Sequence, residues 1–199
     1  DGHLKSDRSG EDWTLTTKRL VFVDFTKVWS YRHCRSQSSE SIENPTERTA
    51  LRALLSSLRL KAQAQGLNPS VLVVCPYAAQ RNAVEDELCE VNSDFNVSVT
   101  TVDAVQGGEA DIVILLMTRN RGRVQFLLDR HRLNVALSRA RDAIIILGHL
   151  HCLARNEEGP VAELIEVGRR NGTLDLIQLP VTGDFKKDLA ARVIGMLPL

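Results

Sequence analysis

Short apolar runs alternate with amphipathic segments from Leu20 to Leu179, the pattern of a parallel sheet covered by helices. The apolar runs cover residues 20–25, 71–75, 97–102, 112–117, 143–147 and 174–179. Several have no polar alternation, which predicts central strands buried on both faces. The sequence therefore predicts an α/β fold of three layers with a mainly parallel sheet and right-handed crossovers.

The first long helix has clear end signals. Asn44 is an N-cap residue, Pro45 fits the first helical position, and Glu47 lies three residues past the cap. Gly66 can end this helix. One face of it carries Leu51, Leu54, Leu55 and Leu58. Further helices are predicted over residues 78–91, over 133–141 and after Pro160.

The pattern predicts one globular domain over residues 19–182. Residues 1–18 and 33–43 are rich in Ser, Asp, Arg and Glu, which is typical of loops or disorder, so we expect a flexible amino-terminal segment. The tail over residues 183–199 can form a short helix docked by Leu189, Val193 and Ile194.

Composition limits the functions that the chain can have. The 199 residues are 43% hydrophobic, enough for one sizeable core. The 25 basic and 25 acidic residues cancel, so nucleic acid would have to be bound by local groups. No apolar run is long enough to span a bilayer, and the polar amino end is unlike a signal peptide. We expect an intracellular protein, cytoplasmic or nuclear, with no membrane partner. Because the numbering starts at Asp1, we also expect a longer parent chain.

The cysteines predict reduced thiols rather than disulfides or a metal centre. Cys34, Cys75, Cys89 and Cys152 are scattered and form no CxxC pair. His-Cys pairs occur at 33–34 and 151–152, but their spacing matches no standard zinc pattern. We interpret them as surface histidines beside ordinary cysteines, and predict no metal site.

Open parallel sheets bind ligands at the carboxyl ends of their strands, so the polar residues there deserve a chemical interpretation. Pro76, Tyr77, Gln80 and Arg81 follow one apolar run and open a predicted helix. A cation at a helix amino end opposes the helix dipole unless it shares an anion. Taken alone, Arg81 favours a solvated surface position over a catalytic one.

The second polar segment runs from Thr101 to Glu109 and contains two consecutive glycines, Gly107 and Gly108. Paired glycines let a backbone approach a phosphate or sugar closely, and Thr101 and Gln106 add uncharged hydrogen-bonding groups. The alternative interpretation is a tight strand connection in which the glycines serve only the turn.

The third segment, residues 131–141, precedes an apolar run. On a helix Arg132 and Arg139 fall on nearly the same side, while Leu133 and Leu137 pack against the sheet. Two guanidinium groups on one side suit a phosphate, because they stay ionised and donate in a fork. A solvated basic face is the alternative.

Together the three segments resemble one family. VVCPYAAQR, TVDAVQGGEADIVIL and RLNVALSRARDAIIILG are similar to motifs IV, V and VI of superfamily 1 helicases, in the branch containing the nonsense-mediated-decay helicase and senataxin. The upstream NPTE resembles the segment that precedes motif IV there. The resemblance spans residues 21–148 and implies a RecA-like domain of P-loop NTPase type, the second of two in such enzymes.

The resemblance implies a role for individual residues. Arg139 matches the arginine finger of motif VI, and Arg81 matches a motif IV arginine that meets the γ-phosphate. The other implied ATP contacts are Gln80, Gly107, Glu109 and Arg132, and the implied nucleic-acid contacts are Thr101, Asp103, Gln106, Pro76 and Tyr77. Gly108 stands where many relatives have a basic residue, and Ser138 stands where threonine is usual.

Half of an ATPase site is missing from this sequence. It contains no GxxxxGK[ST] phosphate loop (Walker A) and no acidic pair after a strand, so we expect the chain alone to be inactive. The resemblance implies ATP and Mg²⁺ in the complete enzyme, with the Mg²⁺ ligands on a first RecA-like domain of the same polypeptide. The other expected partner is single-stranded RNA or DNA.

Two other functions are compatible with a fold of this kind. One is a non-catalytic RecA-like module that binds a protein or nucleic acid. The other is a Rossmann-type dinucleotide domain, but no GxGxxG follows a strand.

Overall fold

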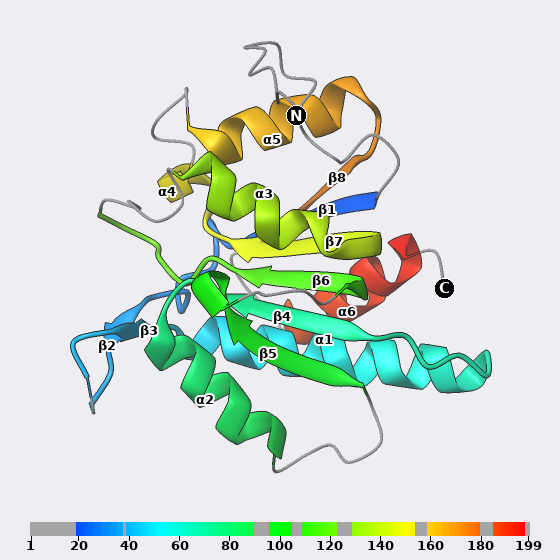
Figure 1. The fold of residues 1–199 in the computed structure, drawn as a ribbon, viewed down its shortest axis with the longest axis horizontal. Coiled ribbons are helices and arrows are strands. Elements are labelled where there is room, and N and C mark those ends of the chain that lie inside the picture. Colours follow the sequence, from blue (N-terminus) through cyan, green and yellow to red (C-terminus); the bar gives the residue numbers. More distant parts are fainter. Residues whose placement is uncertain are drawn as a thin grey trace, which may run out of the picture.

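A computed structural model describes residues 19–37, 39–89, 96–104, 109–122, 129–153, 159–179 and 185–197. Within these residues one sheet of six parallel strands has the order β5-β4-β6-β7-β1-β8 (Figure 1). The strands are β1 (Arg19–Asp24), β4 (Val71–Cys75), β5 (Val97–Thr101), β6 (Ala110–Leu116), β7 (Ala140–Gly148) and β8 (Leu174–Gln178). The predicted α/β fold is confirmed, and each apolar run is a strand.

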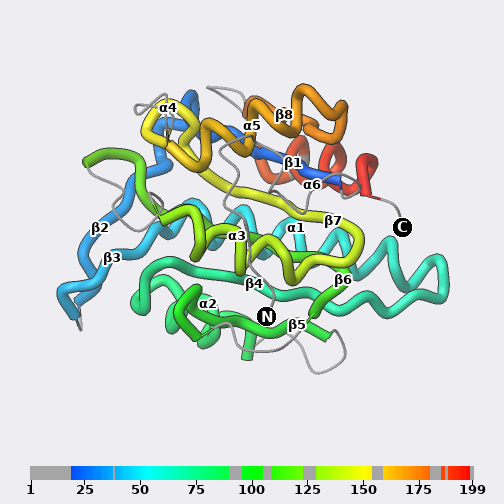
Figure 2. The backbone as a smooth tube through the Cα atoms, turned by 45° about the horizontal axis from the view of Figure 1, so that its top comes forward, coloured from blue at the N-terminus to red at the C-terminus, as the bar shows by residue number. Residues whose placement is uncertain are grey.

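Helices cover both faces of the sheet, as the tube view also shows (Figure 2). One face packs against α1 (Pro45–Ala64), α2 (Ala78–Cys89) and α6 (Phe185–Met196). The other packs against α3 (Arg130–Ser138), α4 (Leu150–Leu153) and α5 (Pro160–Arg170). Right-handed crossovers explain the division: α1 and α2 connect strands in one direction along the sheet, and α3 and α5 connect them in the other.

Side chains of each central strand alternate between the two helical layers. Val21 and Val23 face the layer of α1, whereas Leu20 and Phe22 face the layer of α3, and all four are fully buried. The tail belongs to the same core, since Leu189 and Val193 of α6 pack beside α1 and are themselves fully buried. Lys61 Nζ also donates to the carbonyl of Ile194 at 2.9 Å. Helix α6 is therefore packed into the core of the domain.

The ends of α1 follow the sequence signals. The Asn44 side chain accepts the N–H of Glu47 at 3.2 Å, Pro45 opens the helix, and Gly66 after its end has φ +67°. The segment predicted as a loop over residues 33–43 contains a short antiparallel hairpin, β2 (Cys34–Arg35) with β3 (Ile42–Glu43).

The predicted extent of α3 was wrong at both ends. Asp129 caps the helix by accepting the N–H groups of His131 and Arg132, so it begins at Arg130. It ends at Ser138, because β7 begins at Ala140. Arg139 is consequently the C-cap residue, and Arg141 lies in a strand.

The described residues add three negative observations. Their four cysteines are free thiols. They contain no group of three or more histidine, cysteine or acidic side chains placed to hold a metal ion. None of their helices combines the length and the apolarity needed to cross a bilayer.

Candidate nucleotide and nucleic-acid sites

The candidate residues lie at two opposite edges of the sheet. The strands' carboxyl ends carry Tyr77, the short helix η1 (Val102–Ala104) and the start of α3. Their amino ends carry Glu109 before β6 and Arg139 before β7. The five residues of β4 separate the edges by about 16 Å. We expected the candidate residues at the carboxyl edge, and for Glu109 and Arg139 this was wrong, because each precedes its strand.

At the amino edge the ends of the second and third segments meet. The N–H of Ala110 donates to the Arg139 carbonyl at 2.9 Å, and Ala110 is in register with Ala140. Glu109 accepts from Arg141 Nε at 3.2 Å. Sheet pairing therefore fixes Glu109 next to the Arg139 backbone, although thirty residues separate them in the sequence.

Acidic neighbours hold Arg141 in this position. Hydrogen bonding to Glu109 raises the pKa of Arg141, and Asp111 adds to the effect. Asp111 in turn accepts the N–H and the hydroxyl of Ser70, each at 2.7 Å. These hydrogen bonds lower the pKa of Asp111, so it remains a carboxylate at neutral pH. The positive charge of Arg141 is thus balanced by two carboxylates of the domain itself.

Arg139 differs from Arg141 in its surroundings. Its side chain is partly buried, and its buried Nε has no hydrogen-bond partner among the described residues. A buried guanidinium donor without an acceptor is costly, so a movement of the Arg139 side chain towards an anion outside the domain would be favoured. The chemistry of this position fits a phosphate oxygen.

At the carboxyl edge, Arg132 lies beside η1. Its guanidinium is 3.4 Å from Asp103 and 3.3 Å from Asp129. Arg132 and Arg139 are seven residues apart, about 10 Å along a helix. The structure thus places Arg132, expected at ATP, beside Asp103, which was expected at nucleic acid. Thr101, the last residue of β5, is half-buried at the same edge.

Tyr77 is half-buried at the carboxyl edge and directed towards the loop after β6. Arg119 Nε donates to the Tyr77 hydroxyl at 2.6 Å. Burial raises the pKa of Tyr77 although Arg119 opposes the shift, so the phenol stays neutral at physiological pH. Pro76, half-buried, connects Tyr77 to β4. Sequence reasoning missed Arg119, because a single arginine after a strand carries no pattern.

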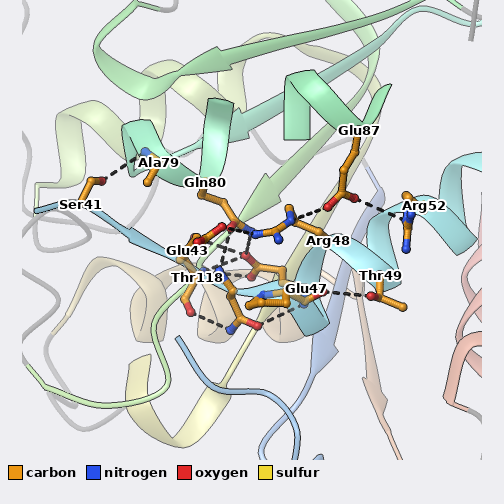
Figure 3. A network of polar contacts seen from close by, with 12 residues as sticks. Ser41, Glu43, Glu47, Arg48, Thr49, Arg52, Ala79, Gln80, Glu87 and Thr118 are labelled. Carbon is orange, nitrogen blue, oxygen red and sulfur yellow. Dashed lines mark hydrogen bonds and ion pairs between the residues drawn. The ribbon is translucent and has the colours of Figure 1, made fainter. Parts of the chain in front are cut away.

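Gln80 is fully buried rather than open to a ligand (Figure 3). Its Oε1 accepts the Asn44 N–H at 2.8 Å, and its Nε2 donates to Glu47 at 2.9 Å. Gln80 therefore completes the helix cap: the Asn44 N–H pairs with Gln80, which leaves the Glu47 carboxylate for other partners. Both ends of the Gln80 amide are used inside the domain, so the geometry does not support its expected ATP contact.

Glu47 is the centre of this buried network (Figure 3). It accepts the Tyr31 hydroxyl at 2.6 Å and the Thr118 N–H at 2.9 and 3.1 Å, and no part of it is exposed. Burial raises the pKa of Glu47 to about 7, against the opposing effect of these hydrogen bonds. The network joins the loop after β1, the starts of α1 and α2, and the end of β6.

Thr118 has a backbone conformation that its side chain disfavours. Its φ is +62°, and a β-branched residue in this region is an outlier that costs on the order of 1–3 kcal/mol. Glu47 accepts its N–H, and Asn44 Nδ2 donates to its carbonyl at 2.9 Å. The network thus holds a strained turn whose next residue is Arg119, the partner of Tyr77.

Arg81 is far from Arg139. Its helix α2 packs on the α1 face and begins at the carboxyl edge, whereas Arg139 ends α3 on the other face and at the amino edge. Arg81 pairs with Glu85 at 2.9 Å, which offsets its unfavourable place near a helix start. The two arginines cannot meet one phosphate from these positions, and that part of the expectation is not supported. Gln106, Gly107 and Gly108 lie outside the described residues.

Comparison with known proteins identifies the family. A family model described as an AAA domain matches residues 2–151. The chain is 31% identical over 170 residues to regulator of nonsense transcripts 1 from Caenorhabditis elegans, covering 79% of this chain and 16% of the relative. It is 33% identical over 106 residues to the probable helicase senataxin from Mus musculus, covering 51% and 4%.

A third relative gives the same result. The chain is 34% identical over 134 residues to the ATP-dependent helicase NAM7 from Saccharomyces cerevisiae, covering 57% of this chain and 13% of that protein. In each comparison the chain spans less than a fifth of the relative's length. From the family match and these identities, the chain belongs to the AAA domain family of superfamily 1 helicases related to the nonsense-mediated-decay regulator and senataxin.

Proposed function

We propose that the chain is the second RecA-like motor domain of an ATP-dependent helicase, in which Arg139 is the arginine finger. One observation carries the assignment: the partly buried Arg139 lies at the amino edge next to Glu109, and its Nε has no hydrogen-bond partner within the described part of the chain. Its neighbour Arg141 is neutralised by Glu109 and Asp111, so Arg139 is the better candidate for an incoming phosphate.

A first RecA-like domain would supply the phosphate loop and the Mg²⁺ ligands that this sequence lacks. ATP, when bound between the two domains, supplies the phosphoryl group that is transferred to water. Arg139 would donate to the oxygens that become more negative in the transition state, and Glu109 would border the nucleotide. Because Arg139 comes from the opposing domain, hydrolysis would require the two domains to close.

The carboxyl edge would hold single-stranded nucleic acid. Thr101 and Tyr77 offer a hydroxyl and an aromatic ring there, and Arg119 provides positive charge. Helix α3 begins at this edge beside Asp103 and ends beside Arg139. A rigid helix of nine residues thus connects the two sites and offers a direct route for coupling them.

The test is steady-state ATP hydrolysis by the full-length protein with saturating single-stranded oligonucleotide. Arg139→Ala should lower turnover by about 10³- to 10⁵-fold and leave most oligonucleotide affinity intact. Arg81→Ala is the matched control, because it removes an equal charge at the opposite edge, and it should retain most activity. Unchanged turnover in Arg139→Ala would refute the assignment, and an equal loss in Arg81→Ala would refute the separation of the two arginines.

A wild-type protein without ATPase activity would favour the alternative function, a non-catalytic RecA-like binding module. That outcome is distinct from an error in the choice of arginine, since the wild-type rate is measured before any variant.

A further inference from the structure

A tryptophan projects into solvent from the turn that follows β1. Trp29 is 77% exposed, although Val28 before it and Tyr31 after it are buried. The Tyr31 N–H donates to the Val28 carbonyl at 3.0 Å, and the Thr46 hydroxyl donates to the Ser30 carbonyl at 2.5 Å. The turn is therefore anchored on both sides of Trp29, and the ring is presented from a fixed backbone.

Arg32 covers one side of this ring. The centre of its guanidinium lies 3.9 Å from the indole centroid, and its Nε donates to the Trp29 carbonyl at 3.3 Å. A cation over an aromatic face restrains the ring and leaves the opposite face free for a second planar group. With most of its surface exposed, Trp29 has room for such a group.

The turn lies at the carboxyl edge, beside the loop that carries Arg119. His33 Nδ1 is 2.6 Å from Asn120 Oδ1, which joins the loop after β1 to the loop after β6. Burial lowers the pKa of His33, and the charges of Arg119 and Arg121 lower it further. Arg119 and Arg121 thus place positive charge beside His33, between the two loops.

The charge of this edge differs from that of the whole chain. The described residues of these two connections carry five basic residues, Lys27, Arg32, Arg35, Arg119 and Arg121, against three acidic ones, Glu40, Glu43 and Asp129. Among the described residues the other exposed large hydrophobic side chains are Leu60, Leu67 and Leu176, which lie in α1, after α1 and in β8 and do not extend an apolar patch around Trp29. An aromatic ring among cations fits a nucleic acid better than an apolar protein surface.

We propose that Trp29, backed by Arg32, is a stacking platform for an unpaired base of the bound strand. This inference rests on the proposed function and extends it, because it adds a contact outside the three motif segments. The platform would recognise the flat face of a base and so bind RNA and DNA without regard to sequence. The neighbouring arginines would hold the phosphates on either side.

The experiment compares oligonucleotides with and without bases. A twelve-residue oligo-dT and an abasic deoxyribose-phosphate chain of equal length are titrated into the full-length protein at fixed salt. Trp29→Ala should weaken oligo-dT binding about 5- to 20-fold and leave abasic binding within about twofold. Trp29→Phe should restore part of the lost affinity, because it restores an aromatic face.

A direct optical signal comes from the same ring. Trp13 and Trp29 are the two tryptophans of these 199 residues. The emission of Trp29 in the full-length protein is therefore measured as the difference between wild type and Trp29→Phe. Stacking should quench Trp29 emission on addition of oligo-dT, with little change on addition of the abasic chain. Wild-type protein that binds neither probe would contradict the proposed function.

Two results would overturn the platform alone. Wild-type binding with no loss in Trp29→Ala would show that the ring does not contact the strand. Equal losses for both probes would show that the ring supports the backbone grip rather than a base. A lower melting temperature of the full-length Trp29→Ala protein, with unchanged oligo-dT affinity, would instead assign the ring to a contact between domains.

Discussion

Glu47→Gln is the sharpest test of the buried network. The Tyr31 hydroxyl, the Thr118 N–H and Gln80 Nε2 all donate to the Glu47 carboxylate within 3.1 Å. At pH 5 folded Glu47 is protonated, because burial raises its pKa to about 7, and its single O–H can donate to the Tyr31 hydroxyl oxygen. A glutamine keeps the shape but carries two hydrogens on its NH₂ group, and the second one meets another donor. Gln80 cannot turn to accept it without giving up the Asn44 N–H. We expect a loss of about 1–3 kcal/mol in the free energy of unfolding at pH 5.

The loss should depend on pH in a defined direction. Burial raises the pKa of folded Glu47 from 4.5 to about 7, so the folded state holds a proton that the unfolded state has released. Wild-type stability should therefore fall as pH rises from about 4.5 to 7, by up to about 3 kcal/mol from this group. The glutamine variant lacks this proton, so the two stability curves should converge or cross by pH 8.

Urea denaturation of both proteins between pH 5 and 8 measures this difference. Titration of His33, whose pKa is lowered by burial, occurs in both proteins and cancels in the comparison. Glu40→Gln is the control, since this side chain is 90% exposed and forms an exposed ion pair with Arg35. It should change stability by less than about 0.5 kcal/mol. Parallel curves for wild type and Glu47→Gln would refute the reasoning.

Backbone geometry gives two further predictions for the same assay. Thr118→Gly should be more stable than Thr118→Ala by about 1 kcal/mol, because φ is +62° there; the usual order, with alanine more stable, would argue against strain. Gly148→Ala should lower the free energy of unfolding by about 1–3 kcal/mol, since its Cβ would lie 2.9 Å from Met117 Cγ. Gly195→Ala in α6 meets open space and should raise the free energy of unfolding by about 0.5–1 kcal/mol. Equal effects of the two substitutions would contradict this packing.

The sequence predicted the elements well where a period and an end signal coincide. The six apolar runs are strands within a few residues, and Asn44 with Pro45 marks the start of α1. The end of α3 was predicted too late. Leu133 and Leu137 have the spacing of a helix, but Ala140 and the residues after it pair with β6 and form the strand β7. Tertiary pairing overrode a local pattern there.

The buried polar network could not be predicted from spacing alone. Glu47 fits a capping box, in which its carboxylate would turn back to the Asn44 N–H. In the structure Gln80, thirty-six residues from Asn44, takes that N–H and releases Glu47 to bind Thr118. The sequence pattern of one helix contains no information about a side chain that packs against it from another helix. We therefore expected Gln80 to contact a ligand.

The separation of Arg81 from Arg139 follows from topology rather than from motif order. Arg81 lies in α2 and Arg139 follows α3 as its C-cap residue, and each helix joins neighbouring parallel strands. Crossovers between parallel strands are right-handed as a rule. From β4 to β5 the chain moves towards one side of the sheet, and from β6 to β7 it moves towards the other. Opposite directions with the same hand require α2 and α3 to cover opposite faces. The order of the motifs along the chain does not contain the order of the strands in the sheet, so it cannot predict that the two helices lie on opposite faces. The strand order β5-β4-β6-β7 does predict it, and it argues against one phosphate that contacts both arginines.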